Sequence, residues 1–134
     1  MGLISSIRGL LSRLDSTAQE EATHQSATID HEYEFEHFTD AVEIIKDLKR
    51  DGSYDEALDV LEWCMYQTEA ESRDTGQGVA PWYYEQAAII YRKDDRYEEE
   101  VNVLERYERQ KHAPGVKPEK LLTRLERART LADE

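Results

Sequence analysis

Two segments of this chain repeat one local pattern at a spacing of 43 residues. The sequence reads DGSYDEAL over residues 51–58 and DRYEEEV over residues 95–101, so that Tyr54 and Tyr97 occupy equivalent places. Runs with apolar residues at helical spacing lie on both sides of each copy. The pattern therefore predicts two helix–tight turn–helix units. Such units stack on one another, and proteins built from them usually bind other molecules instead of making or breaking bonds.

Apolar residues at a helical period predict five helices in the body of the chain, residues 29–134, where no strand pattern occurs. The expected helices run from Ile29 to Arg50, from Tyr54 to about Glu71, from Pro81 to Lys93, from about Arg96 to the HAPG stretch at 112–115, and from about Pro118 onward. Gly52 predicts a tight turn, and the stretch 72–80 with Gly76 and Gly78 predicts a loop. The body is expected to be one all-α domain.

The N-terminal residues 1–14 predict a separate amphipathic helix. Its apolar side carries Leu3, Ile7, Leu10, Leu11 and Leu14. Three roles stay open for it: docking on the body, pairing with a partner or a second copy, and lying in a membrane interface with its arginines against anionic lipid. Residues 15–28 hold almost nothing large to bury, which predicts a flexible acidic linker between this helix and the body.

The charge balance limits the kinds of partner. The chain has 30 Asp and Glu against 17 Lys and Arg, a net charge of -13. Binding a phosphate backbone requires clustered Lys and Arg, so nucleic acid is not an expected partner. Acidic residues spread over helix faces also suit a halophilic source, and an ordinary acidic cytosolic protein is the alternative.

Cysteine use and hydropathy bear on the compartment. Cys64 is the single cysteine, so no internal disulfide can form, and it falls on the apolar side of an expected helix, where a small buried residue is the usual occupant. No apolar run reaches the about 18 residues of a membrane span, and the N-terminus lacks the apolar core of a secretory signal. A cytoplasmic location is expected, with peripheral membrane contact through residues 1–14 as the open alternative.

The repeated pattern resembles the tetratricopeptide repeat family. In that family a first helix with small and apolar residues is followed by a Gly-x-Tyr turn and by an acidic-acidic-Ala-Leu start of the second helix. The first unit matches through Ile44, Ile45 and Leu48 and then the stretch 52–58. The second unit matches less closely, through Ala87, Ala88 and Tyr91 and then the stretch 97–101.

Two residues depart from the family pattern: Asp95 stands in place of the turn glycine and Glu100 in place of the small alanine between helices. The spacing also exceeds the usual repeat of about 34 residues by nine, which we assign to the loop 72–80. The resemblance implies a right-handed stack of antiparallel helix pairs, a TPR-like α-solenoid. It would hold two degenerate repeats, with residues 117–132 as the closing helix.

In such a stack the first helix of each pair lines a concave face. By this resemblance the expected partner-binding groove is formed by Lys46, Lys49, Arg50, Trp82, Glu85, Gln86, Ile89, Arg92 and Lys93. Its cations suit an acidic peptide or a C-terminal carboxylate, and Trp82 suits an apolar anchor. The alternative is that the basic pairs stabilise helix ends through the helix dipole and that Trp82 belongs to the core.

Catalytic and metal-binding patterns are weak in this sequence. Glu34 and His37 form one Glu-x-x-His pair, but the second pair that a di-metal helical site needs is absent, and His31 also has no ligand partner at the right spacing. No Gly-rich phosphate loop or nucleophile elbow occurs. We therefore expect no metal, no cofactor and no enzymatic activity.

These patterns together favour a non-enzymatic adaptor that holds a protein or peptide partner on a helical-repeat groove. The first alternative is a membrane-associated accessory protein tethered by residues 1–14, and the second is a metal-binding or enzymatic helical protein. The sequence leaves the oligomeric state open.

Overall fold

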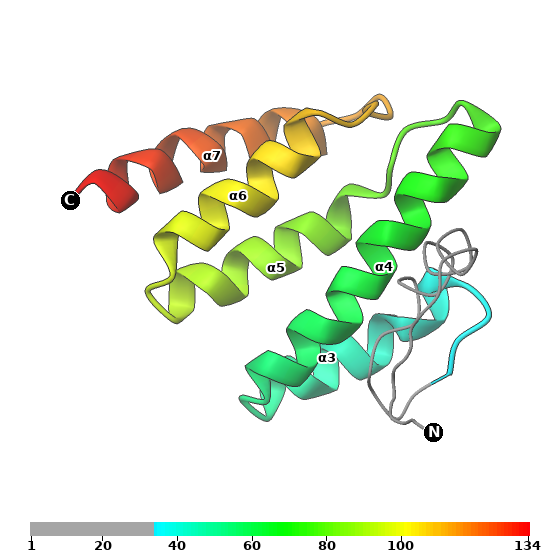
Figure 1. Cartoon of the computed structure of the whole chain (residues 1–134), viewed down its shortest axis with the longest axis horizontal. Helices are drawn as coiled ribbons and strands as arrows, with labels where there is room; N and C mark the ends of the chain where they lie inside the picture. Colours follow the sequence, from blue (N-terminus) through cyan, green and yellow to red (C-terminus); the bar gives the residue numbers. More distant parts are fainter. Residues whose placement is uncertain (1–33) are drawn as a thin grey trace, which may run out of the picture.

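The structure, a computed structural model, describes residues 34–134 and is all-helical in this range (Figure 1). Its elements are the 3₁₀ helix η1 (Phe38–Ala41) and the α-helices α3 (Val42–Arg50), α4 (Tyr54–Thr75), α5 (Pro81–Lys93), α6 (Tyr97–Glu108) and α7 (Lys117–Asp133). Each α-helix packs on the next one along the chain, and α5 also contacts α7. The expected all-α class is confirmed for this part of the chain. The helix predicted over 1–14 and the linker predicted over 15–28 lie outside the described residues.

The two copies of the sequence pattern form two copies of the same turn. Tyr54 is the first residue of α4 and Tyr97 the first residue of α6. Before them, Gly52 has φ +76° and Asp95, at the equivalent place, has φ +57°. Matching backbone hydrogen bonds close both turns, from Gly52 N to Lys49 O at 3.1 Å and from Asp95 N to Arg92 O at 3.1 Å. The repeat is thus a repeat of local structure, set by a left-handed residue that ends one helix and lets the next begin.

The long first helix was predicted to begin at Ile29, and this is wrong for the described residues. Residues 34–37 are not helical, and the helical turn begins only at Phe38. His37 caps it: its Nδ1 accepts a 3.3 Å hydrogen bond from Thr39 N, while the Asp40 carboxylate accepts one of 3.3 Å from His37 N. This reciprocal pair is a capping box. It fixes the start of the helix at a residue that the apolar period does not indicate.

The predicted loop 72–80 is also shorter than expected, because α4 continues to Thr75. Gly76, with φ +78°, ends α4, and its N–H donates a 2.8 Å hydrogen bond to Ser72 O. Part of the extra length between the two repeats is therefore helix. The bounds expected for the helix from Pro81 to Lys93 are confirmed, and α6 and α7 lie within a few residues of expectation.

Alanines let the helices approach closely in the core. Ala57, Ala87 and Ala88 have no exposed surface, and Cys64 is likewise buried, as the sequence predicted.

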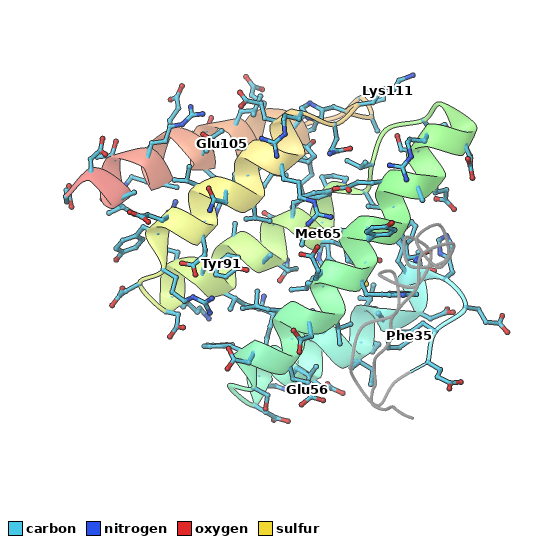
Figure 2. The ribbon with its side chains drawn as sticks, viewed as in Figure 1. Phe35, Glu56, Met65, Tyr91, Glu105 and Lys111 are labelled. Carbon is cyan, nitrogen blue, oxygen red and sulfur yellow. The ribbon has the colours of Figure 1, made fainter. Side chains whose placement is uncertain are left out.

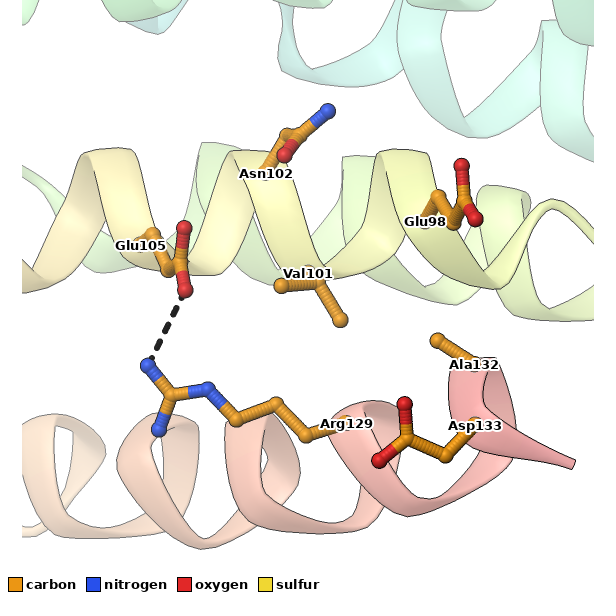
Figure 3. A pocket seen from close by; sticks show the side chains of 7 residues that line it. All are labelled: Glu98, Val101, Asn102, Glu105, Arg129, Ala132 and Asp133. Atoms are coloured by element: carbon orange, nitrogen blue, oxygen red, sulfur yellow. Dashed lines mark hydrogen bonds and ion pairs between the residues drawn. The ribbon is translucent and has the colours of Figure 1, made fainter.

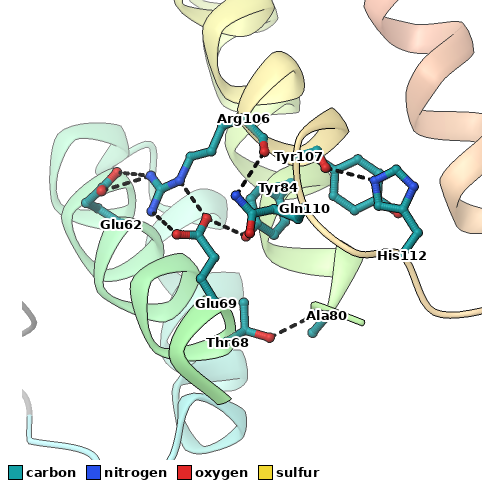
Figure 4. Close-up of polar contacts among 9 residues, drawn as sticks. All are labelled: Glu62, Thr68, Glu69, Ala80, Tyr84, Arg106, Tyr107, Gln110 and His112. Atoms are coloured by element: carbon teal, nitrogen blue, oxygen red, sulfur yellow. Dashed lines mark hydrogen bonds and ion pairs between the residues drawn. The ribbon is translucent and has the colours of Figure 1, made fainter. Parts of the chain in front are cut away.

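A polar network connects α6 to α4 and α5 (Figure 4). Arg106 Nε donates a 2.7 Å hydrogen bond to Glu69 Oε2, and the same oxygen accepts one of 2.7 Å from Tyr84 Oη. Partial burial of these groups makes their pairing more valuable than an ion pair on the open surface.

Candidate functional site

One turn of α5 gathers cations from two other helices. Glu85 and Gln86 are neighbours on α5, and Gln86 is buried. Lys49 Nζ, from the last turn of α3, donates to Gln86 Oε1, and Lys117 Nζ, from the first turn of α7, donates to Glu85 Oε1. Lysines of α3 and α7 therefore contact neighbouring residues of α5, although 68 residues separate Lys49 from Lys117 in the sequence.

Two turns further along α5, a buried carboxylate holds two arginines. Glu100, on α6, has no exposed surface. Arg92 Nε, from α5, donates a 2.9 Å hydrogen bond to Glu100 Oε1, and Arg92 Nη2 lies 2.9 Å from Glu100 Oε2. Arg124 Nε, from α7, lies 3.0 Å from the same Oε2 atom. The contacts to Oε2 have ion-pair distances without hydrogen-bond angles, so their attraction is mainly electrostatic.

Five cations of α3, α5 and α7, connected through their charge interactions with one another and with Glu85 and Glu100, form what we call the basic face: Lys49, Arg92, Lys93, Lys117 and Arg124. Two carboxylates, Glu85 and Glu100, are ion-paired with members of the face. Five positive charges less these two negative charges leave +3, in a chain whose net charge is -13. This local excess of positive charge suits an anionic ligand.

The pKa values show that the cations of the basic face crowd one another. Burial lowers the pKa of Lys49, the charge of Lys93 lowers it further, and Glu85 opposes the shift. Burial also lowers the pKa of Arg124, with Arg92 adding to the effect and Glu100 opposing it. Partial removal from water together with a nearby like charge disfavours each charged form, and the negative charge of a bound anion offsets both effects.

The structure changes the role of several predicted groove residues. Arg92 was expected on the rim of the groove, but its guanidinium is turned to the buried Glu100. Gln86 and Glu85 were expected in the lining of the groove, and each accepts a hydrogen bond from a lysine of the basic face. The reason is non-local: these partners come from α3, α6 and α7, which no pattern within α5 reveals.

The other predicted groove residues lie nearer the surface. Lys46 is 3.8 Å from Glu43, and Arg50 is paired with Asp47, so both cations are paired within α3. Trp82 is half-buried against the core, with its ring edge-on to Tyr83 at a centroid distance of 5.1 Å. Ile89 is also half-buried. Trp82 therefore shares its surface between the core and the outside.

Sequence reasoning missed Lys117 and Arg124, because it treated α7 as a closing helix alone. One signal could have pointed to Arg124. Glu100 stands where the repeat pattern has a small buried residue, equivalent to Ala57, and a carboxylate buried there needs a cation from a neighbouring helix. Arg124 lies on α7, which packs on α6.

A cleft with its own charged lining lies between α6 and α7 (Figure 3). It has a volume of about 350 Å³ and is lined by Glu98, Val101, Asn102, Glu105, Arg129, Ala132 and Asp133. Arg129 Nη2 donates a 3.0 Å hydrogen bond to Glu105 Oε2 across it. Three carboxylates line this cleft, and its one cation, Arg129, is already paired with Glu105, so the charge of the lining does not favour an anion.

The histidine, cysteine and hydropathy patterns lead to no second site. His37 Nε2 lies 2.9 Å from Glu71 Oε2, and residues 34–134 hold no group of three His, Cys, Asp or Glu side chains arranged to bind a metal ion. Burial raises the pKa of Cys64 to about 12. Among the helices of this range, none is long and apolar enough to span a membrane. The predicted contact residues Leu3, Ile7, Leu10, Leu11 and Leu14 lie outside the described residues.

Charged side chains project from the body on all visible sides, with Glu56 at the start of α4 and Lys111 after α6 as examples (Figure 2). What distinguishes the basic face is therefore its concentration of positive charge and the partial burial of all its cations except the exposed Lys93. No protein-family model, curated protein or solved structure matches this chain.

Proposed function

We propose that this chain is a non-enzymatic protein-interaction module that binds an acidic segment of a partner protein on the basic face. In this proposal the helices form a right-handed, TPR-like stack of two degenerate repeats, and α7 closes it. The observation that carries the proposal is that Arg92, Lys117 and Arg124 share only two ion-paired carboxylates, while Lys93 lies close enough to Lys49 for its charge to lower the pKa of that lysine. An acidic peptide supplies the missing negative charge.

The basic face is suited to selective binding because part of its desolvation is already present in the free protein. Lys49 and Arg124 have lowered pKa values for this reason, so an incoming carboxylate meets cations that are weakly solvated. Electrostatic attraction of this kind mainly sets the association rate and the orientation of a partner. Half-buried Trp82 and Ile89, on the same helix, add apolar contact area.

A charge-reversal experiment tests this function. Lys49→Glu/Lys93→Glu replaces two lysines of the basic face and leaves the buried Arg92–Glu100 contact intact. The matched control is Arg73→Glu/Arg109→Glu, which makes the same change in net charge at two exposed residues on α4 and after α6. Binding of a fluorescent glutamate-rich peptide to the full chain is followed by anisotropy, and circular dichroism checks folding.

We expect the basic-face variant to lose binding at least tenfold and the control variant to lose much less. Wild-type affinity should fall as salt rises, because the attraction is between charges that remain partly exposed. Equal losses in the two variants would show a general charge effect and contradict the proposed site. Affinity capture from the source organism's lysate, with the same two variants, then identifies the natural partner.

One sequence observation favours a second candidate function. Residues 1–14 carry five large apolar residues on one helical side and two arginines with no acid, a pattern typical of helices that lie in a membrane interface. In this case the N-terminal helix tethers an accessory protein to anionic lipid. Deletion of residues 1–14 should then abolish sedimentation with phosphatidylserine vesicles while the circular dichroism of the body persists. Unchanged sedimentation would exclude the tether.

A further inference from the structure

We infer that Arg92 and Arg124 form a binding site for a single oxyanion, a carboxylate or a phosphate group, with the buried Glu100 as the residue that positions them. The identity of the natural ligand rests on the proposed function, whereas anion binding at this site does not. Within the basic face this oxyanion site is the one place where two guanidinium groups are held against a common carboxylate.

The contacts leave donors of both arginines free. Arg92 uses Nε and Nη2, and Arg124 uses Nε, in their contacts with Glu100. Arg92 Nη2 also donates a 3.3 Å hydrogen bond to Arg124 O, which ties α5 to α7. Arg92 Nη1 and both terminal nitrogens of Arg124 make no hydrogen bond within the described part of the chain. Guanidinium N–H groups of this kind bind carboxylate and phosphate oxygens through charge-assisted hydrogen bonds.

Charge and exposure indicate that these free donors can meet a ligand. Two guanidinium ions and one carboxylate leave one positive charge uncompensated. The side chains of Arg92 and Arg124 are 28% and 24% exposed, whereas that of Glu100 is fully buried. The carboxylate thus holds the inner edges of the two arginines, and their outer parts reach the surface. A ligand oxyanion adds the second negative charge.

Glu100 makes a prediction that separates positioning from simple attraction. If the basic face acted only through its summed charge, removal of a negative charge by Glu100→Gln would strengthen anion binding. If Glu100 positions the two guanidinium groups, the same change weakens binding, because the arginines lose the ionic contacts that orient them. Glu100 acts through the arginines and touches no ligand itself.

The first test uses ¹⁵N-labelled full-length protein and inorganic phosphate as the probe, with acetate in parallel. The Nε–Hε signals of the arginines are followed by NMR and assigned from Arg→Lys variants. We expect saturable shifts for Arg92 and Arg124 and none for Arg129, whose Nη2 already donates a hydrogen bond to Glu105. Shifts of similar size at all arginines, growing linearly with salt, would overturn the site.

The second test uses variants that keep the charge. Arg124→Lys retains one positive charge but loses the fork of donors, and Arg129→Lys is the matched control on the same helix. We expect Arg124→Lys to weaken phosphate binding about tenfold and Arg129→Lys to leave it unchanged. Unchanged binding by Arg124→Lys would contradict the site. If Glu100→Gln has native circular dichroism, we expect it too to weaken phosphate binding. If it does not fold, Arg124→Lys alone decides the test.

Three versions of one acidic peptide identify the source of the oxyanion: a free C-terminus, an amidated C-terminus and an internal phosphoserine. The version whose affinity falls most in Arg124→Lys supplies the group that the site binds, and equal affinities in wild type and variant for all three would contradict the site. The two proposals can fail separately. Phosphate shifts without peptide binding would support the oxyanion site and reject the proposed function. Peptide binding that is unaffected by Arg124→Lys would support the proposed function and reject the oxyanion site.

Discussion

Arg92 Nε donates a 2.9 Å hydrogen bond to Glu100 Oε1, and the glutamate that accepts it has no contact with solvent. In the first repeat the equivalent place is occupied by Ala57, which is also fully buried. The two repeats thus pack their second helices in different ways. The first uses a small side chain, and the second uses a carboxylate whose charge is balanced by α5 and α7. This makes α7 part of the charge balance of the fold as well as its last helix.

Removal of the Glu100 carboxylate should destabilise the protein strongly. Glu100→Ala leaves Arg92 and Arg124 facing each other, partly buried and without their counter-charge. We expect the free energy of unfolding to fall by about 2–4 kcal/mol, near the lower part of the range for a broken buried pair because both arginines keep some water contact. Urea unfolding of the variant and the wild type measures this difference. Glu98→Ala, an exposed change on the same helix, should stay within about 0.5 kcal/mol, and equal effects of the two changes would contradict this account.

The turn at Asp95 should be improvable by glycine. Asp95 is the one non-glycine residue of the described range with a positive φ, at +57°, a conformation that strains residues with a side chain. Asp95→Gly should raise the free energy of unfolding by about 0.5–1 kcal/mol, since relief of strain outweighs the greater freedom of the unfolded chain. The reciprocal change in the first turn, Gly52→Ala, should lower it by about 1 kcal/mol. Thermal melts of both variants check the pair, and a lower melting temperature for Asp95→Gly would refute the strain.

A side chain at Gly78 should disrupt the contact between the loop that joins α4 to α5 and the loop that joins α6 to α7. A Cβ atom there would lie 2.1 Å from Ala113 N and 2.5 Å from His112 C, both in the backbone. The loops would have to separate, which also breaks the 3.0 Å hydrogen bond from Val79 N to Lys111 O. Gly78→Ala should therefore lower the free energy of unfolding by about 2 kcal/mol or more. Gln77→Ala, next to it and exposed, is the control in the same denaturant experiment.

Stability should fall in alkaline solution because of buried groups that ionise reluctantly. Burial raises the pKa of Cys64 from 9.0 to about 12, and burial likewise raises the pKa values of Tyr83 and Tyr84. A raised pKa stabilises the folded state fully below the ordinary value of the group, and this contribution is lost as the pH rises from about 9 toward 12. Cys64→Ala should make the decline of the free energy of unfolding with pH in this window less steep, by up to about 1.4 kcal/mol per pH unit. An unchanged slope in urea titrations from pH 8 to 11 would count against the burial of the thiol.

Thiol chemistry provides an independent check on Cys64. Its side chain has no exposed surface and lies 3.9 Å from Phe38 O. Modification by an aromatic disulfide reagent at pH 8 should therefore proceed only through opening of the structure and should speed up sharply in denaturant. Rapid, complete modification of the native protein would show that the thiol is accessible.

Local physics explains which features could be predicted from the sequence. The bounds of α5, the two turns and the buried place of Cys64 depend on residues within a few positions of one another, so turn residues and apolar period are sufficient. The start of the first helix was not predicted correctly because His37 and Asp40 fix it through side-chain capping, which the apolar period does not reveal. Lys117 and Arg124 escaped it because they act on residues more than 20 positions away in the sequence.

What the sequence by itself determined is therefore the repeated helix–turn–helix unit, because each left-handed turn and each apolar helix side is a property of a short stretch of chain. Only the tertiary structure decided where the charges lie. It turned Arg92 inward to Glu100 and brought Lys49 of α3 and Lys117 of α7 to neighbouring residues of α5. The physical reason is that burying a charge depends on which helices lie beside it, and neighbours in space are chosen by the packing of the whole core.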